Sequence, residues 1–521
     1  MAICDLSAHS TFLLLLSFLQ LVQTTHSFQS SMDISSSAAA ATSALYAASA
    51  SASASSPNPT PLKVAVIGAG AAGLVTSRIL LRNGIIPTIL EKDAKIGGVW
   101  RYQKKSSTRP MYRGLRTNLP RELMAYREFP WGGDGETQSF VTHNDVKDYL
   151  TRYAKNFGVD GLIQHNSTVK QLSVLTNDDS NADPSWPKIK LEWENGGLDE
   201  DEGEANSSDV FDAVCICNGH YDAPSTPIIP GVEHFKGKIY HSVEYDDPSI
   251  FKGQTVLCVG GRASGSDLAR EISNHATKVY LSDTTCPNLT ERNGEPIQEG
   301  NVAWVPRTTM INTDATISFG PTCNDMPHVD TIIFCSGYDY QFPFINQDSN
   351  LDLSAIPGER CIKPLFEQLW HAKYPSLAFV GLQHSVVPFP FFELQAEAIV
   401  SQMKVGIQSS DGWKLPFLEQ RLKVAKDQAK SGGPKAPGRI QDTHFLGSFQ
   451  WAECTKYARF AGVCDESLIK YVETNKRIYE HSGEQRKSLF PGGVDSYRYN
   501  SYVRDNENQT FQVYPVREEI I

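Results

Sequence analysis

The sequence contains no pair of cysteines separated by two residues, which excludes the usual spacing of a zinc site or a dithiol redox centre. Its ten cysteines are too few for a chain of 521 residues to be a disulfide scaffold. Cys215 and Cys217 would lie on one face of a buried strand, so we expect no bridge between them. We expect no metal site.

The chain also lacks a surplus of basic residues: 48 Lys and Arg face 59 Asp and Glu, for a net charge of -11. A nucleic-acid backbone would find no cationic face, so a small molecule is the more natural partner. A length of 521 residues with 40% hydrophobic content predicts two or three packed units. The sequence does not indicate an oligomeric state.

No Lys or Arg precedes the first apolar run, Thr11 to Val22, and the run is too short to span a bilayer. Together with the small residues Thr25 and Ser27, it makes residues 1–27 resemble a signal peptide. An uncleaved anchor is the alternative, and only then would we expect membrane association. Residues 28–61 are rich in Ser and Ala and favour a plastid transit segment or a flexible linker. We expect entry into the secretory pathway at the endoplasmic reticulum, with a plastid inside the endomembrane system as a further destination.

A glycine-rich turn opens the folded sequence, between a buried-strand pattern at Leu62 to Ile67 and a helical pattern at Leu74 to Arg82. Its residues are Gly68, Ala69, Gly70, Ala71, Ala72 and Gly73. In a dinucleotide-binding turn the first glycine permits the bend, the second admits a pyrophosphate, and the third lets helix and strand pack closely. The next strand, Pro87 to Leu90, ends in Glu91, which lies 91 - 68 = 23 residues after the first glycine, where a carboxylate can accept from a ribose hydroxyl.

A second turn follows the apolar strand Thr255 to Val259 and precedes a helical segment, Asp267 to Ile272. Its residues are Gly260, Gly261, Arg262, Ala263, Ser264 and Gly265. Arg262 replaces the middle glycine, so we expect its side chain to push the backbone away from the phosphates unless the guanidinium contacts them itself. An exposed arginine on a structural turn is the alternative. Two separate nucleotide sites imply a bound flavin and a diffusible nicotinamide.

The second turn also carries an acidic residue in register. The strand Lys278 to Ser282 ends in Asp283, at 283 - 260 = 23 residues from Gly260. A carboxylate there accepts from the 2'-hydroxyl of NADH and repels the 2'-phosphate of NADPH. Arg262 and Lys278 are cations that could offset this repulsion.

Further motifs occur in a fixed order along the chain. Phe235, Gly237, His241 and Tyr245 match the pattern FxGxxxHxxxY without a gap. The other motifs are Gly97 to Trp100, Thr117 to Glu122, Asn218 to Tyr221, Phe334 to Tyr338 and Pro388 to Gln395. Between residues 62 and 405 this order resembles the flavin-containing monooxygenase family, most closely its plant-type branch.

The resemblance implies that NADPH reduces FAD, and that reduced FAD reacts with O2 to give a C4a-hydroperoxide. This species oxygenates a soft nucleophilic nitrogen or sulfur of a small molecule, as in an N,N-dimethylaniline monooxygenase. Asn118 matches the family's asparagine beside the flavin, where its amide can hold the peroxide and the nicotinamide; an ordinary turn residue is the alternative. We interpret His241 as a positioning residue more readily than as a base.

The resemblance also assigns residues to each cofactor. Those expected to bind FAD are Gly68, Ala69, Gly70, Ala71, Ala72, Gly73, Glu91, Lys92, Gly98, Val99, Trp100, Thr117 and Asn118. Those expected to bind NADPH are Gly260, Gly261, Arg262, Ala263, Ser264, Gly265 and Asp283. Asp283 predicts that NADH is tolerated beside NADPH.

The predicted fold class is α/β, with two dinucleotide-binding domains of Rossmann type and the nicotinamide domain inserted into the FAD domain. The FAD domain comprises residues 62–224 and 325–405, the nicotinamide domain 225–324, and a helical extension with a polar tail 406–521. A Baeyer-Villiger enzyme is one alternative, although its signature ends in Trp-Pro where this chain has Tyr245 and Asp246. The missing cysteine pair disfavours a disulfide reductase. A flavoprotein NAD(P)H oxidase, or an FAD-binding protein without oxygenation, is the last alternative.

Overall fold

The computed structural model describes residues 61–104, 109–132, 138–175, 186–196, 205–286, 297–320, 328–408, 415–433, 438–487 and 496–514. Residues 61–521 form one compact unit. The signal-like segment 1–27 and the transit-like or linker segment up to residue 60 lie outside the described residues.

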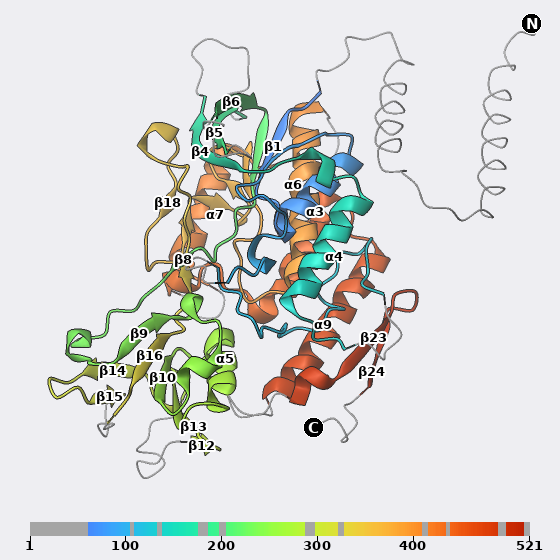
Figure 1. Cartoon of the computed structure of the whole chain (residues 1–521). Helices are drawn as coiled ribbons and strands as arrows, with labels where there is room; N and C mark the ends of the chain where they lie inside the picture. The colour runs from blue at the N-terminus through green and yellow to red at the C-terminus, as the bar shows by residue number, and fades with distance from the viewer. Residues whose placement is uncertain are drawn as a thin grey trace, which may run out of the picture. The chain divides into compact units, whose positions relative to one another are not determined.

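A seven-stranded sheet forms the first fold (Figure 1). In spatial order its strands are β20 (Leu365–Phe366), β21 (Trp370–His371), β22 (Leu377–Phe379), β7 (Ala213–Ile216), β1 (Val64–Ile67), β2 (Thr88–Leu90) and β3 (Ile163–Gln164). The strands from β22 to β3 are parallel, and β20 and β21 add an antiparallel edge.

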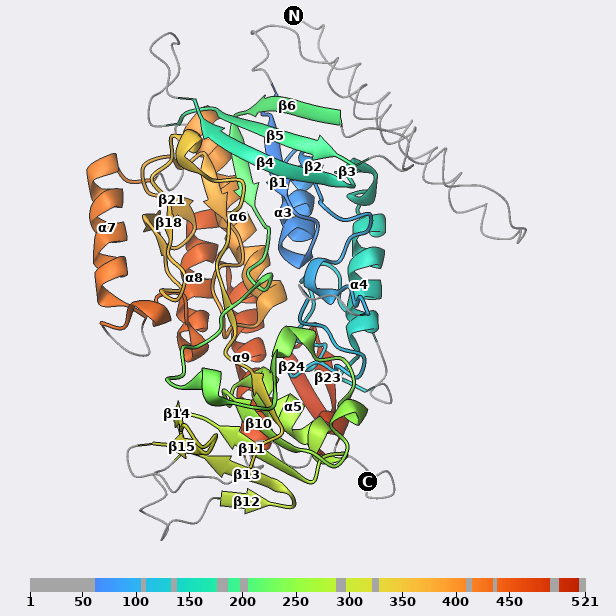
Figure 2. The same cartoon turned by 60° about the vertical axis from the view of Figure 1, so that its left-hand side comes forward.

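Both faces of the first sheet are covered, as the uninterrupted apolar strand β1 requires. Val64 and Val66 point into a core shared with the helices α3 and α6, and Ala65 and Ile67 point into a core shared with a three-stranded meander. The helices on this unit are α3 (Ala71–Arg82), α4 (His143–Asn156), α6 (Pro388–Gln408), α7 (Leu418–Ser431), α8 (Gln450–Ala461) and α9 (Glu466–Lys487). The meander consists of β4 (Ser167–Val174), β5 (Ile189–Asn195) and β6 (Ala205–Phe211), seen along the upper edge in Figure 2.

A six-stranded sheet and the helix α5 (Ala263–Ser273) form the second fold. Its spatial order is β12 (Ile297–Glu299), β13 (Val302–Val305), β11 (Lys278–Ser282), β10 (Thr255–Val259), β16 (Thr331–Phe334) and β9 (Lys238–His241). Val256 and Cys258 of β10 face α5, whereas Leu257 faces a core that includes the hairpin β14 (Thr308–Ile311) and β15 (Ile317–Phe319). The predicted fold class, with one nucleotide-binding fold inserted in the other, is confirmed.

The predicted boundary at residues 324 and 325 is wrong by one strand. β16 (Thr331–Phe334) pairs in parallel with β10, so the inserted fold continues to Phe334. An isolated buried strand carries no sign of which sheet it joins, and pairing partners distant in sequence decide that. The outward crossing β8 (Ala223–Pro224) and the return crossing β17 (Tyr338–Asp339) pair antiparallel, so a two-stranded ribbon joins the two folds.

The C-terminal extension is more ordered than the expected polar tail. It ends in the turn η10 (Ser496–Tyr499) and a hairpin of β23 (Ser501–Asp505) and β24 (Thr510–Tyr514). Both η10 and β24 contact α9, and Figure 2 shows the hairpin in red beside that helix. The short hairpin β18 (Ser354–Ala355) and β19 (Ile362–Lys363) completes the described strands.

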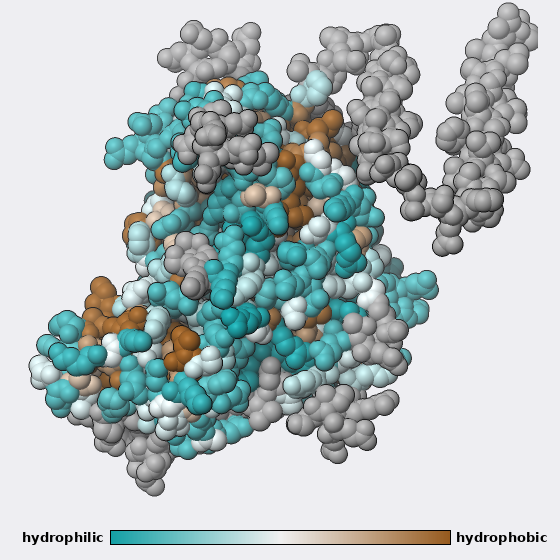
Figure 3. All heavy atoms as spheres, in the orientation of Figure 1, coloured by the Kyte–Doolittle hydropathy of each residue, from teal (hydrophilic) through white to brown (hydrophobic). Residues whose placement is uncertain are grey.

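The face drawn in Figure 3 is largely hydrophilic, and apolar side chains gather mainly at its lower left and near the top. Among the described residues, no helix combines the length and apolar character needed to cross a membrane. All the described cysteines are free, Cys215 and Cys217 included, as expected.

Candidate active site

The first glycine turn needs glycine at its two ends. Gly68 has φ +101°, and a Cβ there would lie 2.6 Å from the carbonyl oxygen of Cys217. A Cβ on Gly73 would lie 1.8 Å from the carbonyl oxygen of Gly68. Gly70 is different: its φ of -81° and ψ of -171° suit any residue, and its added Cβ would make an ordinary contact, 3.5 Å from the Cα of Gly98. The fold alone does not require glycine at position 70, whereas a pyrophosphate against the backbone does.

The second turn repeats this geometry. Gly260 has φ +112°, and a Cβ there would lie 2.6 Å from the carbonyl oxygen of Cys335. A Cβ on Gly265 would lie 1.7 Å from the carbonyl oxygen of Gly260. Arg262 has φ -78° and ψ -166°, nearly those of Gly70, so its side chain does not displace the backbone. The middle position is extended and Arg262 lies exposed at the helix terminus. That its side chain keeps phosphates away from the backbone, unless the guanidinium contacts them, stays a prediction.

The two predicted ribose carboxylates brace their turns. Oε2 of Glu91 accepts a hydrogen bond from the Ala69 N–H, 2.6 Å, and Oδ2 of Asp283 accepts one from the Gly261 N–H, 2.8 Å. Burial raises the pKa of Glu91, and the backbone N–H groups bonded to it oppose that rise. Each carboxylate therefore lies beside the second residue of its turn, as the equal spacing predicted. Their contact with a ribose stays a prediction.

The helices that follow the turns, α3 and α5, have no side-chain cap and no acidic residue in their first turns. By contrast, α4 begins with a capping box in which Thr142 and Asp145 satisfy each other's backbone N–H groups. Uncapped N–H groups and the positive end of the helix dipole suit an external anion. Two uncapped helices after two glycine turns fit two nucleotide pyrophosphates.

The segment from Gly98 to Trp100 is held next to the first turn. The Gly97 N–H donates to the Ala69 carbonyl, 3.1 Å, and Nη1 of Arg109 donates to the Gly98 carbonyl, 2.7 Å. Arg109 also pairs with Asp93. Gly98, Val99 and Trp100 remain partly accessible, as a contact surface for a cofactor requires. Lys92 instead points to the surface, where it pairs with Asp222 at 2.5 Å.

Asn118 lies in a loop that is bonded to the segment 138–142. The N–H of Thr117 donates to the Val141 carbonyl, 2.8 Å, and Oγ1 of Thr117 accepts from the Val141 N–H, 3.1 Å. Thr117 is thus buried and fully engaged with protein. Within the described ranges the half-buried amide of Asn118 makes no hydrogen bond, so its donor and acceptor are both available to a ligand.

His241 holds the ribbon between the two folds. Its Nδ1 accepts from the Val243 N–H, 3.2 Å, so its proton is on Nε2, which donates to the Gly337 carbonyl, 3.1 Å. Burial lowers the pKa of His241, which keeps this neutral tautomer. A base would need its free nitrogen exposed to substrate, so the geometry favours the positioning role.

Tyr245, the last residue of the FxGxxxHxxxY pattern, continues this attachment. Its hydroxyl donates to Oε2 of Glu271 on α5, 2.7 Å, and its ring meets that of Tyr112 at 5.2 Å. Tyr112 belongs to the first fold but is buried in the core of the second. The hydroxyl of Tyr102 likewise donates to Asp246, 3.1 Å. The pattern therefore lies along the junction of the two folds.

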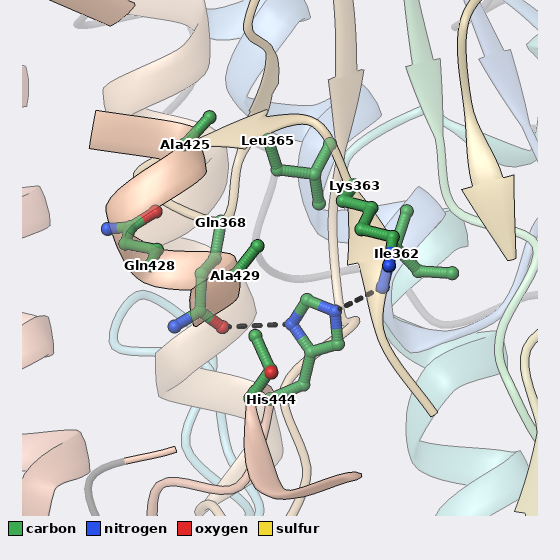
Figure 4. Close-up of a pocket in the computed structure, with 9 residues that line it drawn as sticks. Ile362, Lys363, Leu365, Gln368, Ala425, Gln428, Ala429 and His444 are labelled. Carbon is green, nitrogen blue, oxygen red and sulfur yellow. Dashed lines mark hydrogen bonds between the residues drawn. The ribbon is translucent and has the colours of Figure 1, made fainter. Parts of the chain in front are cut away.

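A small pocket lies between β19, β20 and α7 (Figure 4). His444 stands at its edge: Nε2 accepts from the Ile362 N–H, 2.9 Å, and Nδ1 donates to Oε1 of Gln368, 2.9 Å. Burial lowers the pKa of His444 to about 3, so the ring stays neutral. Because both ring nitrogens are satisfied by protein, His444 is structural.

The sequence patterns did not identify two residues that hold the segment beside the first turn and the junction of the two folds. Arg109 and Tyr112 lie in a stretch without periodicity, and no motif links them to their partners, Gly98 and the core around Tyr245. No local signal could have identified them, because an arginine that donates to a carbonyl looks like any surface arginine in the sequence.

Comparison with known proteins identifies the family. A family model described as flavin-binding monooxygenase-like matches residues 61–297. The flavin-containing monooxygenase FMO GS-OX5 of Arabidopsis thaliana is 33% identical over 437 residues, which cover 80% of this chain and 88% of that protein. The chain is a flavin-containing monooxygenase. A second Arabidopsis thaliana relative, FMO GS-OX-like 2, is 33% identical over 84% of this chain and 94% of its own length.

Solved structures agree with this assignment. The S-allyl-L-cysteine S-oxygenase from Allium sativum superimposes with a TM-score of 0.71 at 29% identity, and covers 86% of this chain and 97% of its own. Tmm from Pelagibacter sp. strain HTCC7211 shares the fold, with a TM-score of 0.65 at 20% identity over 88% and 96% of the two chains. As a flavin-containing monooxygenase, the protein uses FAD, NADPH and O2 to oxygenate a small molecule.

Proposed function

We propose that this flavin-containing monooxygenase oxygenates the soft sulfur of a small thioether, and that Asn118 holds the reacting groups. The similarity to the Allium sativum S-oxygenase supports sulfur as the target. A nucleophilic amine nitrogen is the second candidate, because its lone pair undergoes the same transfer. The observation that carries the proposal is the amide of Asn118, which has no partner among the described residues. It lies in a loop that Arg498 joins to the helix after the second turn.

The residues present fit the two cofactors. FAD would lie with its pyrophosphate on Gly70 and the N-terminus of α3, and NADPH on Arg262 and the N-terminus of α5. When bound, FAD supplies the activation of O2. Asn118 can donate to one group and accept from another, and Trp100 and Val99 lie partly accessible beside the first turn. Neutral His241 keeps the ribbon between the folds in place and moves no proton.

The proposal is tested with purified enzyme containing FAD, offered matched thioethers and tertiary amines while NADPH oxidation and products are followed. We expect thioethers to accelerate NADPH oxidation and to yield one sulfoxide per NADPH. If amines alone give product, the sulfur assignment is wrong. If neither substrate class gives product while NADPH is consumed, the protein acts as an oxidase.

Asp283 is expected to weaken the preference for NADPH. Its carboxylate lies at the end of β11, where it would meet a 2'-phosphate, and a partly exposed like-charge contact costs about 1 kcal/mol. Lys278 cannot offset this cost, because it is the first residue of β11 and Asp283 follows the last, so the two side chains lie at opposite ends of the strand. Arg307 is better placed: it follows Val305, whose carbonyl accepts from the Asp283 N–H at 3.1 Å. Its exposed side chain has no partner among the described residues.

We therefore expect Asp283→Asn, which keeps an acceptor for Gly261, to lower KM for NADPH severalfold and to raise KM for NADH. Arg307→Ala should raise KM for NADPH and leave KM for NADH unchanged. Steady-state kinetics with both nucleotides measure the two effects. Equal responses of both nucleotides to Asp283→Asn would show that the carboxylate only braces the turn.

A further inference from the structure

Arg498 occupies an unusual position for a residue so near the C-terminus. It lies in η10 with only 4% of its surface exposed. Its Nε donates to the carbonyl of Thr117, 2.9 Å, and its Nη2 pairs with Oδ2 of Asp267 on α5, 2.8 Å. One guanidinium therefore joins the first fold, the second fold and the C-terminal segment.

The carbonyl bonded by Arg498 belongs to the peptide that links Thr117 to Asn118. A bond that holds this peptide also fixes the backbone position from which the Asn118 side chain projects. Other bonds attach the C-terminal segment to this loop and to the segment 138–142 that is bonded to it. Nη2 of Arg116 donates to the Arg498 carbonyl, 3.1 Å, and the Tyr502 N–H donates to Oγ of Ser139, 2.7 Å.

The second contact of Arg498 is with the second fold, the one expected to bind NADPH. Asp267 lies on α5, the helix that begins directly after the second glycine turn, and it also pairs with Arg270 at 3.1 Å. The guanidinium of arginine suits this arrangement, because its N–H groups lie in one plane and can bind a carbonyl and a carboxylate in fixed directions. A lysine has one terminal nitrogen and cannot reproduce both contacts in this geometry.

We propose that Arg498 is a positioning residue, which fixes the Asn118 peptide relative to α5. The C-terminal segment thereby sets the distance between the Asn118 amide and the second nucleotide site. This inference rests on the proposed role of Asn118 and assigns a function to a segment outside residues 61–297, the part that the family model matches. The buried contact is too specific for a tail that merely covers apolar surface.

Three variants of the full-length enzyme containing FAD test the proposal. Arg498→Met removes both contacts, and Arg498→Lys keeps the positive charge but not the guanidinium. Arg504→Met is the matched control, since Arg504 lies on the hairpin that follows η10 and bonds Asn475 and Gln509 instead of Thr117 and Asp267. For each, we would measure FAD content, the melting temperature, hydrogen exchange of peptides spanning residues 115–124, and hydrogen peroxide released per NADPH.

We expect Arg498→Met to increase exchange in residues 115–124 about tenfold and to increase peroxide release severalfold, with FAD content unchanged. Arg498→Lys should give intermediate values. Arg504→Met should lower the melting temperature by a similar amount and leave exchange and peroxide release at the original level.

The proposal is overturned if Arg498→Met and Arg504→Met are indistinguishable in both readouts. It is also overturned if exchange increases without peroxide release, provided that Asn118→Ala itself releases peroxide. Should Asn118→Ala leave coupling intact, the proposed role of Asn118 has failed, and hydrogen exchange alone decides whether Arg498 holds the loop.

Discussion

Asn118→Ala should retain FAD yet convert most of its NADPH into hydrogen peroxide. The amide is half-buried and unpartnered within the described residues, so its loss leaves the fold intact and removes a donor and an acceptor from the reacting groups. A hydrogen bond of this kind contributes about 1–3 kcal/mol, so we expect oxygenated product per NADPH to decrease about tenfold or more. Product and peroxide, both measured per NADPH consumed, give the coupling directly.

The matched control is Asn195→Ala, which removes an amide bonded to Ser167 and Ser207 in the meander. That variant should lose some stability and keep its coupling. Asn118→Asp supplies a stricter comparison, because it preserves size and acceptors but no longer donates. Unchanged coupling in both Asn118 variants would remove the residue from the site.

Gly73→Ala should lower the stability of the fold, whereas Gly70→Ala should weaken FAD binding. At Gly73 the new Cβ would lie 1.8 Å from the Gly68 carbonyl, so we expect the protein without FAD to lose about 3 kcal/mol or more of stability. At Gly70 the nearest atom is 3.5 Å from the new Cβ, so stability without FAD should change by less than about 1 kcal/mol. Gly70→Ala should instead weaken FAD binding at least about tenfold, because the methyl group occupies space against the pyrophosphate.

Denaturant unfolding of the protein without FAD, together with FAD titration, separates the two effects. Gly161→Ala is a suitable control, because an added Cβ there meets nothing within 4 Å. A Gly70→Ala enzyme that binds FAD with the original affinity would show that no phosphate approaches this turn. A stable Gly73→Ala protein would show that helix and strand can separate without cost.

The turns could be predicted because their signals are local. A glycine-rich turn between an apolar strand and a helix is typical of dinucleotide binding, and an acidic residue at a fixed spacing adds a second constraint. The same reasoning placed Glu91 and Asp283 beside their turns, where both brace a backbone N–H.

The errors and omissions concern pairings between distant segments. β16 was assigned to the wrong fold because a four-residue apolar strand suits either sheet equally well. The hairpin at the C-terminus was missed, although the runs at 501–505 and 510–514 flank an Asn-rich turn and carried a weak signal. No signal indicated that Arg498 reaches Thr117, 381 residues earlier in the chain.

We propose that this protein transfers one oxygen atom from O2 to the sulfur of a small thioether. The most direct measurement is turnover with FAD-loaded enzyme, NADPH, a simple alkyl thioether and ¹⁸O2 in ordinary water. We predict a sulfoxide that carries a single ¹⁸O atom, formed in step with NADPH oxidation. An unlabelled sulfoxide, whose oxygen would come from water, or NADPH consumption that yields peroxide without any sulfoxide, would contradict this proposal.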